Sequence, residues 1–233
     1  MAASHNNSMG PILLGLVFLG LMLPHTAKVF RSYERTVSVK GLCEKEVKAD
    51  KVIWPLVYKV VGNDMDVVYK AIEGEKSSII EFLNKGGIKA EEISVSLPSV
   101  SDKFSENYVD VNRVYRYVAS CTITVCSQDV DKVLAVMNRQ NELLAKGIVL
   151  STEWDSKPQF TFEGLNEIKP QMIEEATKNA RAAADKFAKD SDSKLGKIKT
   201  ANQGQFSITD RDSNTPQEKK VRVVTSIEYY LKK

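Results

Sequence analysis

The stretch EEATKNARAAADKFAKDSDSKLGKI, residues 174–198, carries the strongest structural signal in the chain. Apolar residues recur here at steps of three and four, the period that places one stripe on one face of a helix. The stripe comprises Ile173, Ala176, Ala180, Ala184 and Phe187. Because most of these side chains are methyl groups, the helix backbone can lie close to the surface that it packs against. The pattern predicts a helix packed on a sheet rather than a cofactor site.

Outside this helix, alternating apolar and polar residues predict a series of strands. The final strand, 221–231, alternates most regularly, and another at 198–208 precedes it. Further strands are expected at 37–39, 52–60, 93–97, 115–125 and 148–162, and helices at 64–85 and 127–147. Paired strands joined by short polar turns indicate an α+β class, a largely antiparallel sheet with three helices packed on its faces.

Single residues mark the ends and irregularities of these elements. Pro55 lies inside the strand at 52–60, which is therefore expected at a sheet edge or with a bulge there, because proline cannot donate a hydrogen bond. Ser127 is expected to cap the second helix, and Gly147 to end it in a left-handed conformation. The polar stretch 99–112 predicts an exposed loop or the frayed end of a hairpin.

Two patterns in the chain resemble the signature of the SIMPL domain family, bacterial envelope proteins also catalogued as a domain of unknown function. One is the alanine-rich helix followed by KLGKI, residues 194–198. The other is VSVKG, residues 37–41, with a second strand after KAD, residues 48–50. The resemblance spans 35–233. It implies a domain outside the inner membrane and, as in some SIMPL proteins, assembly into rings or channels. It implies no catalytic residue.

The N-terminal region contains an uncharged apolar run, MGPILLGLVFLGLML, at residues 9–23. A membrane-spanning helix needs about 17 to 25 mainly apolar residues, a length reached only if the run is extended to Ala27. The segment before the run lacks Lys and Arg, and His25-Thr26-Ala27 is a poor cleavage site. An uncleaved hydrophobic helix, a membrane anchor at 9–27, is favoured over a cleaved signal peptide or a buried segment. The α+β domain then occupies 35–233.

The orientation in the membrane is contested by two arguments. Lys28, Arg31 and Arg35 follow the apolar run, and the positive-inside rule would keep that side cytoplasmic. The resemblance to SIMPL proteins instead places the domain outside the inner membrane. Whole domains can override the charge bias, so we expect an inner-membrane protein with a single N-terminal anchor and its domain in the periplasm.

Residues able to carry chemistry are scarce. His5 and His25, the only histidines, both lie beside the apolar run, so the domain has no imidazole for general-base catalysis or metal binding. No glycine-rich phosphate-binding motif occurs. We therefore expect no catalytic residue, no cofactor-binding residue, no metal site and no enzyme activity, and no small-molecule substrate is identified.

The three cysteines lead to different expectations. Cys121 and Cys126 lie five residues apart on one expected strand, about 16 Å between Cα atoms at about 3.3 Å per residue, too far for a disulfide. Cys121 falls on the apolar face and is expected to be buried. Cys43, expected in a polar turn beside Lys45, is the candidate for a free or redox-sensitive thiol.

Charge and composition exclude some partners and leave two function classes open. The net charge is +3 and basic residues form no block, so nucleic-acid binding is not expected. The first class is a non-enzymatic, membrane-anchored homo-oligomer, ring- or channel-like, with a role in envelope integrity or stress tolerance implied by the resemblance. The second is a membrane-tethered monomeric module that binds a peptide, lipid or cell-wall ligand through loops near Tyr108 or Asp210. The native mass of the protein would distinguish them.

Overall fold

The computed structural model describes residues 17–20, 35–105, 114–153 and 156–232. Most of the anchor expected at 9–27 lies outside these described residues. Within them, no helix is both long enough and apolar enough to cross a membrane. From residue 35 onward the chain divides into two compact units. The first contains 35–45, 168–207 and 221–232, and the second contains 46–167 and 208–220.

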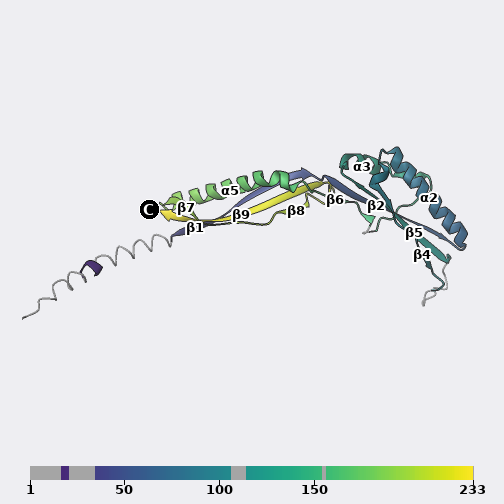
Figure 1. Ribbon diagram of the computed structural model, residues 1–233, viewed down its shortest axis with the longest axis horizontal. Coiled ribbons are helices and arrows are strands. Elements are labelled where there is room, and N and C mark those ends of the chain that lie inside the picture. Colours follow the sequence, from purple (N-terminus) through teal and green to yellow (C-terminus); the bar gives the residue numbers. More distant parts are fainter. Residues whose placement is uncertain (1–16, 21–34, 106–113, 154–155, 233) are drawn as a thin grey trace, which may run out of the picture. The chain divides into compact units, whose positions relative to one another are not determined.

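The first unit is an antiparallel sheet with one long helix against it (Figure 1). The strand order is β1-β9-β7, with β8 also paired to β9. The elements are β1 Thr36–Lys48, α5 Leu165–Asp190, β7 Lys194–Gln203 and β9 Glu218–Lys232, and the paired strand β8 Ser207–Asp210 belongs, apart from Ser207, to the second unit. The two closing strands expected from the sequence are thus present, with the earlier one divided into β7 and β8.

Helix α5 buries a row of small residues, as the alanine pattern predicts. Every fourth residue is buried, and the row comprises Met172, Ala176, Ala180, Ala184 and Ala188. Two members of the expected stripe differ, because Ile173 is half-buried and Phe187 is 61% exposed. A strict four-residue step advances about 40° around a helix of 3.6 residues per turn, so the buried row winds around α5. A row that winds in this way leaves Phe187 on the solvent side.

Gly41 in β1 brings the strand and helix backbones into direct contact. A Cβ atom on Gly41 would lie 1.9 Å from the carbonyl oxygen of Ala176 and 2.8 Å from the Cβ of Ala180. Real Cβ atoms do not approach other atoms so closely, so no other residue type fits between this strand and this helix without moving one of them.

The second unit is a five-stranded antiparallel sheet of order β3-β5-β2-β6, with β4 paired to β5 and helices against one face (Figure 1). Its elements are β2 Lys51–Gly62, α2 Met65–Lys85, η1 Ala90–Glu92, β3 Ile93–Val95, β4 Ser99–Asp102, β5 Tyr117–Ser127, α3 Val130–Met137, α4 Asn141–Ala145 and β6 Gln159–Thr161. Leu56 of β2, Ile123 of β5 and Leu83 of α2 belong to one buried core. Antiparallel sheets with packed helices confirm the expected α+β class.

The helix expected at 127–147 is two helices, α3 and α4. Asp129 caps α3 by accepting a hydrogen bond from the backbone of Lys132, so the expectation that Ser127 is the cap was wrong. Between the helices the backbone bonds tighten to the i→i−3 pattern, as in Arg139 N to Val136 O. The tighter winding changes the helical phase, so Leu143 is buried and Leu144 is exposed. Gly147 has a φ of 84°, the expected left-handed conformation.

The strand expected at 148–162 is mostly irregular. Only β6 is a strand, and Leu150 forms one isolated bridge with Tyr58. β2 lies between β5 and β6, but β6 pairs with it only as far as Ile53, and in the described residues no strand pairs with Pro55 on that side. The strand as a whole is internal, and the expected edge position holds only locally at Pro55.

Asp50 ties the turn between β1 and β2 to the segment before α5. Its carboxylate accepts hydrogen bonds from the backbone N–H groups of Glu163 and Gly164, at 2.8 and 2.7 Å. Its own N–H donates to the carbonyl of Thr161. The carboxylate thus satisfies backbone donors immediately ahead of the helix. Sequence reasoning noted KAD only as the segment before the second strand and missed this role.

The contact at Gly41 predicts opposite effects of one substitution at two glycines. Gly41→Ala should lower the free energy of unfolding by at least about 1 to 3 kcal/mol, because the new methyl group forces strand and helix apart. Gly74→Ala, at an exposed position of α2 with no atom within 4 Å of the new Cβ, should raise it by about 0.5 to 1 kcal/mol. Urea unfolding followed by circular dichroism measures both. Equal effects at the two sites would contradict the close packing of β1 on α5.

Candidate interaction surface

The outer side of β1 is one edge of the sheet in the first unit. β1 ends the sheet, and within the described residues no strand lies beyond it. The backbone bonds Leu231 N to Arg35 O and Ala49 N to Gln217 O fit one antiparallel register with β9. Odd-numbered residues of β1 therefore direct their N–H and C=O groups toward β9. The even-numbered residues direct theirs outward, and we call the outward groups of Ser38, Lys40, Leu42 and Glu44 the β1 edge.

The side chains along the β1 edge are exposed and alternate in character. Leu42 is 41% exposed at the centre, between Lys40 and Glu44. Glu44 lies 3.7 Å from Arg222 of β9 in a partly exposed ion pair. Asn179 of α5 donates a hydrogen bond of 2.9 Å to the carbonyl of Leu42. A carbonyl oxygen has two lone pairs, so the Leu42 carbonyl can accept a second hydrogen bond.

The opposite edge of this sheet, at β7, is built differently. Its pairing with β9 shifts register between Leu195 and Ile198 and again before Thr200. Lys197 and Lys199 are exposed in the same short stretch. Irregular pairing and lysine side chains are devices that discourage an edge strand from joining another sheet. The β1 edge also carries an exposed lysine, Lys40, but the backbone bonds at the two ends of β1 fit a single register with β9.

The loop near Asp210 satisfies its own polar groups. Asp210 pairs with Lys219, whose side chain is buried. Hydrogen bonds from Thr215 and then Arg211 lower the pKa of Asp212 to about 2. A loop that is internally bonded in this way has few groups left for a ligand. Tyr108, the other loop residue expected to bind a ligand, lies outside the described residues.

The cysteines differ from expectation at Cys43. It lies within β1, not in a polar turn, and is 3% exposed. Burial, together with a contact to Glu175 of α5, raises the pKa of its thiol to about 11. A buried, protonated thiol is unreactive, so the proposed redox-sensitive role of Cys43 has no support from its environment. Cys121 is buried as expected, and Cys126 is exposed.

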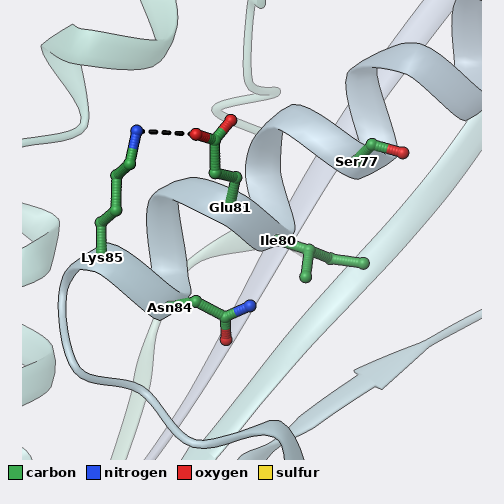
Figure 2. Close-up of a pocket in the computed structure, with 5 residues that line it drawn as sticks. All are labelled: Ser77, Ile80, Glu81, Asn84 and Lys85. Carbon is green, nitrogen blue, oxygen red and sulfur yellow. Dashed lines mark ion pairs between the residues drawn. The ribbon is translucent and has the colours of Figure 1, made fainter.

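Two surface hollows lie in the second unit. Figure 2 shows one, lined by Ser77, Ile80, Glu81, Asn84 and Lys85 of helix α2. Lys85 bonds Glu81 at 2.6 Å and, with a weaker contribution from Lys146, lowers the pKa of that carboxyl. Both side chains are more than half exposed, so the pair contributes little to stability.

The second hollow is more apolar and lies beside β2. It has a volume of about 500 Å³, and its lining includes Trp54, Pro55, Met137, Leu144 and Leu150. It lies on the side of β2 where β6 has ended. A cavity of this size and lining is in the range of small-ligand sites. In the part of the chain that the structure describes, no group of three His, Cys, Asp or Glu residues is arranged to hold a metal ion.

A comparison with known families identifies the chain. The SIMPL family, described as "Protein of unknown function (DUF541)", matches residues 37–229. The match covers most of the chain and nearly all of both units, so the protein belongs to the SIMPL family. No curated protein matches the chain.

The cysteine environments predict selective labelling. In the native protein at pH 8, a thiol reagent such as Ellman's reagent should modify Cys126 and spare Cys43 and Cys121, since these two are buried. All three should react in urea. Cys126→Ser should abolish native labelling and serves as the control. Rapid labelling of Cys43 in the native state would contradict its burial under α5.

Proposed function

We propose that this protein is a non-enzymatic, membrane-anchored envelope protein that forms a homo-oligomeric, ring- or channel-like assembly. The observation that carries the proposal is the β1 edge. Long, regular edge strands present unpaired N–H and C=O groups and invite another strand, so proteins normally blunt or cover them. The β7 edge is interrupted by register shifts, whereas the backbone bonds at both ends of β1 fit one register with β9. A strand from another subunit is the natural cover for such an edge.

The proposed membrane anchor and location are supported by the sequence. The uncharged run at 9–23 supports an anchor at 9–27, and the resemblance to SIMPL envelope proteins described above implies a domain in the periplasm. A shared anchoring surface also raises the local concentration of subunits, and this favours assembly. A role in envelope integrity or stress tolerance is part of the same proposal.

The hollow beside β2 supports a second candidate function. A monomeric, membrane-tethered module could bind a peptide, lipid or cell-wall ligand there, with apolar contacts from Trp54 and Leu150. This candidate accounts for the hollow but not for the regular β1 edge. The oligomer is therefore the better supported candidate.

The native mass of the full-length protein distinguishes the two candidates. Protein extracted with mild detergent should give a single mass several times 26.0 kDa in light scattering, after subtraction of the detergent. A mass of one chain across the micromolar concentration range would reject the oligomer and favour the binding module. In the same preparation, N-terminal sequencing should begin near Met1, whereas a start after Ala27 would reject the anchor.

A further inference from the structure

We propose that the β1 edge pairs with the β1 edge of a second copy, antiparallel and about a two-fold axis at Leu42. The inference rests on the proposed function, because it names the contact by which copies of this chain assemble. It commits to one partner, one pair of strands and one register. The partner's residues are identical to those on this strand, so each contact occurs twice.

The backbone of β1 presents the groups that this pairing uses. The N–H and C=O groups of Lys40, Leu42 and Glu44 point outward in the plane of the sheet, at the spacing that an antiparallel neighbour requires. In the proposed pair, each Leu42 exchanges two hydrogen bonds with Leu42 of the second copy. The bond from Asn179 uses one lone pair of that carbonyl and leaves the other available.

The exposed side chains select the register. With the axis at Leu42, the two leucines meet across the ladder, and Lys40 of each copy lies opposite Glu44 of the other. Opposite charges at directly facing positions stabilise an antiparallel pair, and like charges destabilise it. Lys40 takes part in no ion pair within the described residues, so the dimer supplies it with a partner. Glu44 keeps its contact with Arg222 and gains Lys40 on its other side.

Neighbouring registers lose these contacts. An axis at residue 41 sets Lys40 against Leu42, and an axis at residue 43 sets Leu42 against Glu44. An axis at Glu44 places two carboxylates opposite each other. Only the register centred on Leu42 joins apolar to apolar and positive to negative at every one of the three central positions. The side chains of the β1 edge are thus complementary to those of a second copy in this register.

Two-fold pairing at every β1 edge has a consequence for stoichiometry. A two-fold contact joins copies in pairs, so a closed assembly that uses it in every subunit contains an even number of chains. The native mass should therefore be an even multiple of 26.0 kDa. An odd multiple would overturn the β1 pairing and leave the proposed oligomer intact.

Charge reversal at the edge tests the register directly in the full-length protein. Lys40→Glu places a second carboxylate opposite Glu44 of the other copy, and Glu44→Lys places a second ammonium group opposite Lys40. Each variant alone should lower the native mass at least twofold. When the two variants are produced together, every facing pair in the mixed dimer is again oppositely charged, and the mass should return to that of the wild type. Local misfolding in either variant cannot produce this recovery.

The native mass also serves for the control variant and for the outcomes that would contradict the pairing. Lys186→Glu makes the same charge change on the exposed side of α5 and should leave the mass unchanged. The proposed pairing would be overturned if the single variants kept the wild-type mass or if their mixture stayed dissociated. In either case, a large mass of the wild-type protein would still support the oligomer. A monomeric wild type would overturn both.

Cross-linking provides a second test that does not depend on charge. Facing residues of an antiparallel hydrogen-bonded pair have Cα atoms about 5.5 Å apart, within disulfide range. In a Cys126→Ser background, Leu42→Cys should therefore form a covalent dimer on mild oxidation. Ile198→Cys, at an exposed position of β7, should not. A dimer from Ile198→Cys and none from Leu42→Cys would assign assembly to the β7 edge and overturn the inference.

Discussion

The contact between the backbones of β1 and α5 at Gly41 is the constraint on which the first unit depends. It leaves no space for side chains larger than methyl groups in the middle of the helix, which explains alanine at every fourth position. The same closeness buries Cys43 two residues later and places it against Glu175, so the thiol stays protonated. In the same sheet, the buried hydroxyl of Thr225 has no hydrogen-bond partner in the described part of the protein.

The two-residue period of β1 separates the core from the proposed interface within a single strand. Val39, Gly41 and Cys43 face α5 and also direct their main-chain groups toward β9. The intervening residues face solvent and direct theirs outward. A change at Lys40 or Glu44 therefore leaves the buried positions untouched. The strand can hold the helix with one set of residues and contact a partner with the other.

Sequence patterns predicted the elements that local periodicity determines. They missed the features that depend on contacts between residues far apart in the chain. The alanine helix, the strands β2, β5 and β9 and the end of the second helix at Gly147 follow from local spacing. Phe187 was misplaced because the sequence does not show whether buried residues recur at alternating steps of three and four or at steps of four. Only the surface that the helix packs against decides between these two spacings. Cys43 was misplaced because polar neighbours on an edge strand resemble a turn. The β1 edge could not be found at all, since strand order is not a property of local sequence.

Several charges on the described surface are neutralised by neighbours in the sequence, and this limits what a partner could recognise there. Asp212 is held by Arg211 and Thr215, and Glu81 by Lys85, all within a few residues of one another. Such pairs offer little net charge to attract a ligand. Main-chain hydrogen bonds can join any strand to an open edge, so they do not select a partner by its sequence. Selectivity for a second copy must then come from side chains beside the edge, where a lysine, a leucine and a glutamate at alternate positions are complementary to themselves in one register.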